Sequence, residues 1–419
     1  MQKRFTSPWL MWGLGAALFF SEYFGRVAPS VMVPELMRDF QVTAFALGAL
    51  SAFFYYPYIA MQVPVGMMVD RYGPHRLLTS TAIVCAGGCL LFAFANNLAT
   101  AQLGRMLMGF GAAFAFVGAL KLATNWFPPE RFGLLAGLTQ ALGMLGAFVG
   151  QAPMAWSVAQ FGWRHTLVIV AISFLFLALL IGLIVRDKPQ GDKKLKQPQI
   201  IHTSLLHGLK QVLQNPQSWW NAIYAGLVYA PTAAFAELWG VSFLVNAYGI
   251  DTRTAALGIG LIFIGWGIGG PLIGWFSDRI LRRKPIMYAS ALIGCLIMGT
   301  ILYIPNLPIP LLFALLFGYG VSNTGVATAY AVSAEINPRP IAGTSMAFAN
   351  MASVIIGAIF QPIIGWLLDK HAGVTAQVVH PVYQADDFRY ALVLLPVCML
   401  LGVFFAKLVK ETHCRPVTQ

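Results

Sequence analysis

Apolar runs of 18 or more residues recur between Pro8 and Lys407, and they constrain the fold of this chain more than any other feature. In the hydrocarbon core of a bilayer every backbone N–H and C=O group must be bonded internally, so only helices or a closed barrel can span it. Barrel strands alternate apolar and polar residues, whereas these runs are apolar on every side. The sequence therefore predicts an all-α integral membrane protein.

Charged residues are scarce and unevenly placed. Of the 419 residues, 10% are charged and 58% are hydrophobic, which leaves too few polar side chains to cover a soluble surface. If the N-terminus lies in the cytoplasm, 19 of the 27 Lys and Arg residues fall on the inner side, five on the outer side and three within spans. The positive-inside rule then places both termini in the cytoplasm and accounts for the net charge of +12 without nucleic acid as a partner.

The sequence contains no pattern typical of an enzyme or of a resident cofactor. Its five cysteines show neither zinc nor disulfide spacing, and four of them lie in apolar runs as small fillers. No Gly-rich loop ends in Gly-Lys-Ser/Thr, and no nucleophile accompanies a base. We therefore expect no metal, no cofactor and no enzymatic activity.

The apolar runs divide into twelve expected transmembrane helices, six on each side of a polar stretch rich in lysine. The expected ranges are 9–34, 44–69, 76–95, 100–125, 132–157 and 163–185, then 218–246, 254–277, 285–304, 309–334, 341–368 and 389–409. Residues 1–185 would form one six-helix bundle and residues 218–419 a pseudo-symmetric second bundle with a short cytoplasmic tail. Residues 186–217 would form a cytoplasmic linker on the membrane surface.

A charged junction occurs twice and relates the two halves. Residues 66–76 read GMMVDRYGPHR, and residues 274–279 read GWFSDR, so the two copies begin 208 residues apart. A smaller echo pairs Gln151-Ala152-Pro153 with Gln361-Pro362. Halves related in this way are typical of duplicated carriers, whose sites lie near the bilayer midplane.

The first junction also carries a family resemblance. Its pattern, with the run Arg105-x-x-x-Gly109-x-Gly111-Ala112, resembles the loop 2–3 and helix 4 motifs of the major facilitator superfamily, and the resemblance implies two bundles that rock about a central cavity. An acid and a base at a helix end can lock one access state by ion pairing and helix-end charge. The alternative, charges that only mark the membrane edge, leaves the glycine spacing unexplained. The expected gating residues are Gly66, Asp70, Arg71, Gly73, Arg76, Asp278 and Arg279.

The first expected helix carries two charges near mid-bilayer. Glu22 and Arg26 are four residues apart and thus on one helix face, where charges are costly and meet a cavity or a partner. Pro29 predicts a kinked or loosened helix beside Arg26. The stretch 23–36 is similar to helix 1 of the organic-anion carriers of the superfamily, which implies that Arg26 binds the negative charge of the substrate. The alternative, that Glu22 and Arg26 only neutralise each other, stays open.

Glu237 is the only acidic residue well inside a span of the second half. Burial disfavours the charged form of a carboxyl group, so Glu237 can take up a proton from one side and release it to the other, as proton-coupled transport requires. Glu22 is the competing proton site, although its pairing with Arg26 favours the charged form. Several organic-anion carriers have a glutamate where this chain has Ala112, which leaves the coupling ion open.

Besides Arg26 and Glu22, three uncharged residues are candidates for substrate contact: Tyr56, Asn323 and Asn350. Amides in membrane helices also bond neighbouring helices, which is the alternative role. Lys121 lies 16 residues beyond Arg105 and is a candidate second cation for the substrate or a side chain that snorkels to the inner surface. For Arg105, near the outer end, snorkelling is the expected role.

Together these features predict a monomeric secondary transporter of a bacterial-type inner membrane. The mixed charges of Arg26, Glu22 and Glu237 favour a small anionic or zwitterionic solute. The run 26–32 is also similar to helix 1 of uptake carriers of intracellular proteobacteria, which implies import of an organic acid, an amino acid or a carboxylate siderophore, and proton coupling is favoured. The alternative is a proton-driven exporter of drugs or metabolites, weakened because Pro153 follows Ala152 and not a glycine. A sensor or partner-binding membrane protein would be expected to have an added soluble domain or an unusual loop.

Overall fold

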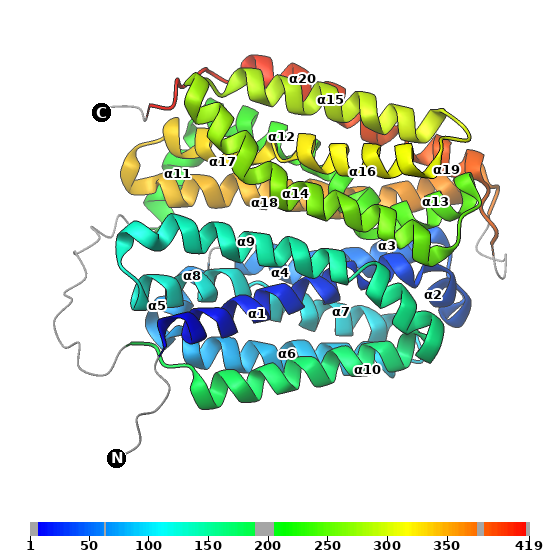
Figure 1. Cartoon of the computed structure of the whole chain (residues 1–419), viewed down its shortest axis with the longest axis horizontal. Coiled ribbons are helices and arrows are strands. Elements are labelled where there is room, and N and C mark those ends of the chain that lie inside the picture. Colours follow the sequence, from blue (N-terminus) through cyan, green and yellow to red (C-terminus); the bar gives the residue numbers. More distant parts are fainter. Residues whose placement is uncertain (1–6, 63, 189–204, 375–380, 416–419) are drawn as a thin grey trace. The chain divides into compact units, whose positions relative to one another are not determined.

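The computed structural model describes residues 7–62, 64–188, 205–374 and 381–415, and every regular element in these ranges is a helix (Figure 1). Ten helical segments of the described residues are long and apolar enough to cross a bilayer. The predicted all-α membrane fold is therefore confirmed. The lysine-rich part of the predicted linker lies outside the described residues.

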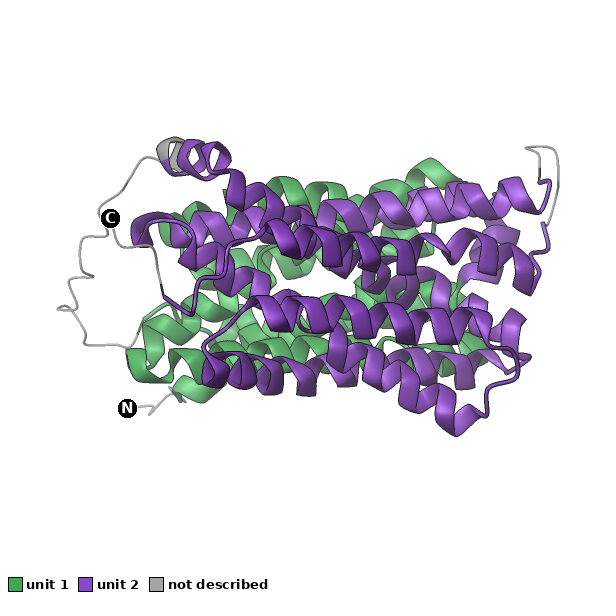
Figure 2. Ribbon diagram, turned by 90° about the horizontal axis from the view of Figure 1, so that it is seen from above, with its two compact units in different colours: residues 1–32, 53–197 green, residues 33–52, 198–419 purple. Residues whose placement is uncertain are grey.

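The chain forms two compact units (Figure 2). Unit 1 comprises Met1–Met32 and Phe53–Gln197, and unit 2 comprises Val33–Ala52 and Pro198–Gln419. Two short helices, α2 (Val33–Phe40) and α3 (Ala44–Ala52), thus belong to unit 2 although they come early in the chain. The predicted division into bundles at residues 185 and 218 stays a prediction.

The described residues of unit 1 form eight α-helices and two 3-10 turns. They are α1 (Pro8–Val27), η1 (Ala28–Val31), α4 (Tyr55–Met61), α5 (Pro64–Tyr72), α6 (Pro74–Ala93), α7 (Leu98–Ala112), α8 (Ala115–Trp126), η2 (Pro129–Arg131), α9 (Phe132–Val149) and α10 (Ala152–Ile184). The predicted first helix is interrupted beside Arg26, because the α-helix ends at Val27 and Pro29 lies in the 3-10 turn that follows. The predicted loosening of this helix is confirmed.

Unit 2 is built from the remaining helices. Besides α2 and α3 they are α11 (Leu205–Gln214), α12 (Pro216–Pro231), η3 (Thr232–Trp239), α13 (Gly240–Tyr248), α14 (Thr252–Ile280), α15 (Lys284–Tyr303), α16 (Ile309–Asn323), α17 (Val326–Glu335), η4 (Arg339–Ile341), α18 (Ala342–His371), α19 (Ala385–Leu392) and α20 (Leu394–Leu408). The element η3 is a π-helix that joins α12 to α13. π-Helices are rare and frequently occur at functional sites.

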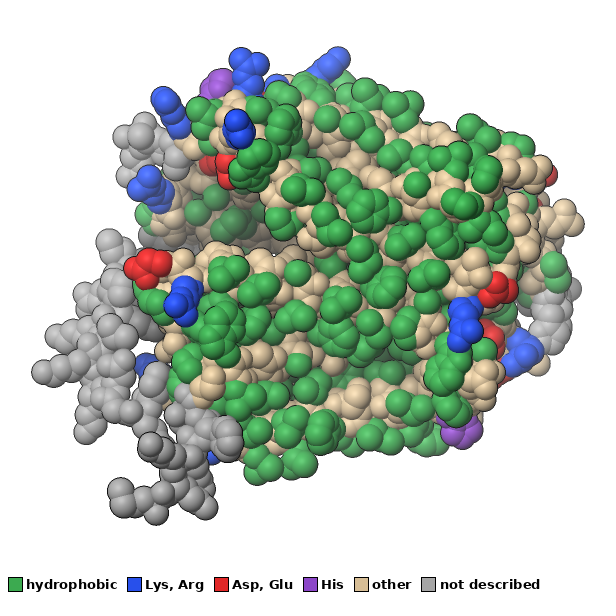
Figure 3. All heavy atoms as spheres, in the orientation of Figure 1, with side chains coloured by type: hydrophobic (Ala, Val, Ile, Leu, Met, Phe, Trp, Pro, Cys, Tyr) green, Lys and Arg blue, Asp and Glu red, His purple; other side chains and the backbone are tan. Residues whose placement is uncertain are grey.

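Long stretches of helix surface are apolar where they face outward. Figure 3 shows hydrophobic side chains along the middle of the helices, with lysine, arginine and acidic side chains toward their ends. On α10 the exposed large hydrophobic side chains include Ile169, Ile172, Leu175, Phe176, Leu179 and Leu183. In water such a surface would be unfavourable, whereas lipid chains solvate it.

Helix α7 approaches the chain at Phe54 closely enough to require a glycine. A Cβ added at Gly109 would overlap the carbonyl oxygen of Phe54. We expect Gly109→Ala to lower the free energy of unfolding by about 1–3 kcal/mol, because backbone must move to admit the methyl group. The thermal unfolding midpoint of the purified protein measures this. Gly87→Ala on α6 is the matched control, since nothing lies within 4 Å of its added Cβ; equal midpoints for the two variants would contradict the prediction.

Candidate substrate and proton sites

Arg26 and Glu22 form a buried ion pair in unit 1. Both lie near the C-terminal end of α1, and Arg26 Nη2 is 3.1 Å from Glu22 Oε1. Arg26 is 4% exposed and Glu22 is 2% exposed. The i,i+4 spacing on the helix makes this contact possible, as the sequence predicts.

Aromatic rings surround the Arg26 guanidinium. Its Cζ lies 4.7 Å from the ring centre of Tyr23 and 4.9 Å from that of Tyr58, with Phe54 at 5.6 Å and Tyr55 at 5.8 Å. Ring faces attract a cation, and the attraction strengthens when water is excluded. The unit therefore contains a permanent positive charge in surroundings that strengthen its attraction for an anion.

Arg105 does not extend to a surface, so the predicted snorkelling is wrong. It is fully buried on α7 and donates hydrogen bonds to the carbonyl oxygens of Gly25 and Arg26, the latter at 3.4 Å. Its Cζ lies 4.8 Å from the ring centre of Phe54. Arg105 thus supports the end of α1 that carries Arg26. The glycines that follow it in sequence could have indicated this burial, because they let helices approach closely.

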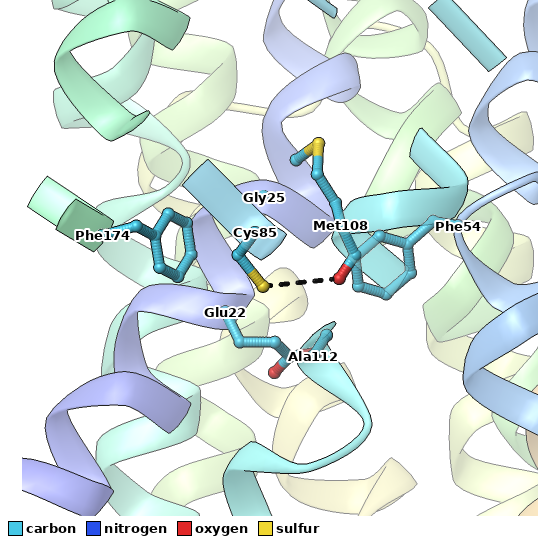
Figure 4. Close-up of a pocket in the computed structure, with 7 residues that line it drawn as sticks. All are labelled: Glu22, Gly25, Phe54, Cys85, Met108, Ala112 and Phe174. Carbon is cyan, nitrogen blue, oxygen red and sulfur yellow. Dashed lines mark hydrogen bonds between the residues drawn. The ribbon is translucent and has the colours of Figure 1, made fainter. Parts of the chain in front are cut away.

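A narrow pocket lies beside Glu22 (Figure 4). Its lining residues are Glu22, Gly25, Phe54, Cys85, Met108, Ala112 and Phe174. Cys85 Sγ donates to the carbonyl oxygen of Met108 at 3.6 Å and lies on the side of the pocket facing Glu22. The pocket has no room for a water molecule. Glu22 is therefore screened from bulk water on this side.

Glu237 lies on the π-helix η3 of unit 2. It is 1% exposed, and Tyr229 Oη donates to Glu237 Oε1 at 2.9 Å. The wider turn begins directly after Pro231, the last residue of α12. A buried carboxyl group with a hydroxyl partner on an irregular helix has the properties of a proton-carrying group.

The uncharged candidates occupy different surroundings. Asn323 is fully buried, donates to the carbonyl oxygen of Val228 at 2.8 Å and accepts from Thr232 Oγ1 at 3.0 Å. These bonds join α16 to α12 and η3, which is the alternative role of a membrane amide. Asn350 accepts from Tyr330 Oη at 3.2 Å, whereas Tyr56 is 46% exposed. Two tyrosines whose rings lie over Arg26, Tyr55 and Tyr58, are sequence neighbours of Tyr56.

The first charged junction lies at the turn between α5 and α6. Gly73 has φ 81°, a conformation that favours glycine, and precedes the first residue of α6. Asp70 pairs with Lys121 Nζ at 2.6 Å, while Arg71 and Arg76 are exposed and nothing lies within 4 Å of a Cβ added at Gly66. The partner of Asp70 on α8 was not predicted from the sequence.

The second junction has a denser network of charges. Arg283 Nη1 lies 2.7 Å from Asp278 Oδ1, and its Nη2 lies 2.7 Å from Glu335 Oε1. Arg279 lies with its Cζ 5.3 Å from the ring centre of Trp275. Unit 2 therefore pairs its junction acid with Arg283, whereas unit 1 uses a lysine from another helix. Among the residues that the structure describes, no group of three or more His, Cys, Asp or Glu side chains could hold a metal ion.

The Lys121 contact leads to a prediction. Because Lys121 pairs with Asp70 at a helix end, we expect Lys121→Met to change ligand affinity by less than about five-fold, the factor that corresponds to the 1 kcal/mol limit of an exposed pair. Transport rate should change more, since the pair belongs to the expected gate. Titration calorimetry and initial rates of uptake measure the two quantities. A loss of affinity as large as that from an Arg26 variant would instead make Lys121 a ligand contact.

Comparison with known proteins identifies the class. The model of the Major Facilitator Superfamily matches residues 15–361, and the chain belongs to this family. It is 26% identical to the probable sulfoacetate transporter SauU of Cupriavidus necator over 291 residues, 68% of each chain. It is 22% identical to the probable galactarate/D-glucarate transporter GarP of Escherichia coli over 393 residues, 85% of this chain and 87% of that one.

Two further similarities concern a sensor and the fold. The chain is 26% identical to the membrane sensor protein UhpC of Salmonella typhimurium, covering 85% of this chain and 83% of that one. The inward-facing, unoccupied crystal structure of a bacterial homologue of the human lysosomal transporter Spinster has a TM-score of 0.79 at 17% identity, covering 95% of this chain and 96% of that one. The protein is thus a multi-pass membrane protein with the fold of this transporter family, as the resemblance implied.

Proposed function

We propose that the protein is a secondary transporter of a small organic anion, driven by protons and importing its solute across a bacterial inner membrane. Arg26 would bind the acidic group of the solute, and Glu237 would carry the proton, with Glu22 as the competing proton site. Tyr56, Asn323 and Asn350 are the proposed uncharged contacts. Both termini would lie in the cytoplasm, and the expected unit of function is a monomer.

The main support for this proposal is that Arg26 is buried and surrounded by aromatic rings. A guanidinium presents paired N–H donors to carboxylate or sulfonate oxygens, and removal from water strengthens the attraction. The named solutes of two relatives, sulfoacetate and galactarate or glucarate, are organic acids, which supports an anionic solute here. A neutral sugar or a cationic drug would gain no charge attraction from Arg26.

A second candidate is a membrane sensor that binds an anion without moving it. The similarity to UhpC favours it, because the alignment covers 85% of this chain and 83% of that sensor. The same Arg26 site would serve both functions. Binding alone therefore cannot separate them, and transport must be measured.

A thermal-shift screen of the detergent-purified protein tests the ligand class, since a ligand that binds only the folded state raises the unfolding midpoint. The set contains sulfocarboxylates, aldarates, dicarboxylates, ferric carboxylate siderophores, amino acids, sugars and cationic drugs. Stabilisation by an organic acid that disappears in an Arg26→Gln variant is the expected result. Stabilisation by cationic drugs alone would replace the proposal by the exporter alternative.

A further inference from the structure

The first turn of α3 is hydrogen-bonded to α18. The backbone N–H groups of Ala44 and Phe45 donate to the two oxygens of Asp369, each at 3.0 Å. Tyr383 accepts from Ala44 N at 3.1 Å and donates its own hydroxyl to Asp369. Burial, and then the bond to Asp369, raise the pKa of Tyr383, so the hydroxyl stays neutral and remains a donor. A carboxylate at a helix N-terminus is favourable for both partners.

One turn further on, α3 rests directly on the backbone of α18. A Cβ added at Gly48 would lie 2.5 Å from the carbonyl oxygen of Gln361 and 2.8 Å from Cα of Pro362. Only a glycine permits this approach. The surface of α18 that contacts α3 at Gly48 therefore includes Gln361 and Pro362.

Gln361 also holds the π-helix that carries Glu237. The side-chain Nε2 of Gln361 donates to the carbonyl oxygen of Ala233 at 2.8 Å, and the backbone carbonyl oxygen of Gln361 accepts from Trp239 Nε1 at 3.0 Å. Ala233 precedes Glu237 by four residues and Trp239 follows it by two. The side chain of Gln361 is fully buried. One residue thus contacts η3 on both sides of Glu237 and supports α3 as well.

We infer that Gln361 is a positioning residue that couples the charge of Glu237 to the docking of α3 on α18. The inference rests on the proposed role of Glu237 in proton coupling. A buried carboxyl group is most favourable when neutral, so the docked arrangement belongs to neutral Glu237. Ionisation makes burial away from water less favourable, which favours a displacement of η3, and the two bonds of Gln361 transmit that displacement to the surface beneath Gly48.

The chain links α3 directly to the helix that lies beside the proposed anion site. Helix α3 ends at Ala52, and α4, which begins at Tyr55, carries two of the rings around Arg26. Separation of α3 from α18 would therefore change how firmly α4 and its two rings are held in place. A coupling of this kind between two sites is a free energy that a double-mutant cycle measures.

The test uses the thiol introduced by Ser51→Cys, labelled by a small maleimide and followed by peptide mass spectrometry. Ser51 is 1% exposed and lies three residues beyond Gly48 on the docked face of α3. At alkaline pH, which favours the charged form of the native Glu237, Glu237→Gln in the Ser51→Cys protein should slow labelling by about five-fold or more, because the neutral side chain favours docking. Adding Gln361→Met, which keeps the length of the side chain but removes its donor, should reduce that response to less than about two-fold.

Gln151→Met is the matched control. Gln151 is also a fully buried glutamine, but it lies in unit 1, where Ser30 Oγ donates to it at 3.2 Å. The response to Glu237→Gln should persist in its presence. If Gln361→Met fails to fold, Trp239→Phe removes the second bond to Gln361 and should weaken the response likewise.

Two outcomes would overturn the inference. One is an equal response to Glu237→Gln with and without Gln361→Met, and the other is no response even when Gln361 is present. Uphill accumulation of solute by the Glu237→Gln variant, measured separately, decides the proton role. Failure of the coupling is thus distinguishable from failure of the proposed function.

Discussion

Arg26→Gln is expected to weaken binding of the organic acid found by the screen by about 30-fold or more, which corresponds to 2 kcal/mol or more. The guanidinium is 4% exposed and lies among four aromatic rings, so water screens its attraction for an anion only weakly. Titration calorimetry on the purified protein measures the dissociation constant. An unchanged constant would remove Arg26 from the site.

A paired variant separates anion binding from simple neutralisation of Glu22. Arg26→Gln alone leaves a buried carboxylate without its cation, which destabilises the protein by about 3–5 kcal/mol when such a pair is broken. The double variant Glu22→Gln with Arg26→Gln removes both charges and restores electrical balance. If Arg26 only neutralises Glu22, the double variant will bind the anion as the native protein does. If Arg26 binds the anion, the double variant will fold but still fail to bind.

Glu237→Gln is expected to abolish accumulation of solute against its gradient while leaving exchange of solute across the membrane intact. The amide has the shape of the neutral carboxyl group and can still accept the hydrogen bond from Tyr229, but it cannot release a proton. Reconstituted vesicles measure both quantities: uptake driven by an imposed pH gradient, and counterflow of labelled against unlabelled solute. Glu22→Gln is the comparison, because Glu22 is the competing proton site.

Three results of this pair of variants would contradict the assignment. Normal uphill uptake by Glu237→Gln would exclude Glu237 as the proton carrier. Loss of uphill uptake in Glu22→Gln with exchange retained would transfer that role to Glu22. Loss of both uptake and exchange in Glu237→Gln would indicate a structural role, consistent with its place on η3.

Much of the fold could be predicted from the sequence because lipid imposes one simple rule. A long run that is apolar on every side must be a helix, and Pro29 removes a backbone donor from the first one, so the helical class and the break after Val27 could be expected. The spacing of Glu22 and Arg26 also determined their contact, since it depends on one helix alone.

Contacts between helices could not be predicted in the same way. Arg105 was expected at a surface, yet it bonds the carbonyl oxygens at the end of α1, because packing of distant segments decides its surroundings. The pairing of Lys121 with Asp70 depends on where α8 meets the end of α5. The placement of α3 in unit 2 depends likewise on Asp369, more than 300 residues away in sequence.

Transport by the reconstituted protein is the most direct test of the proposed function. Vesicles containing the purified protein are loaded at neutral pH and diluted into acidic buffer that contains the labelled organic acid, with and without a protonophore. Accumulation above the outside concentration that the protonophore abolishes is the predicted result. Binding of the acid with no uptake and no exchange would contradict a transporter and favour the sensor.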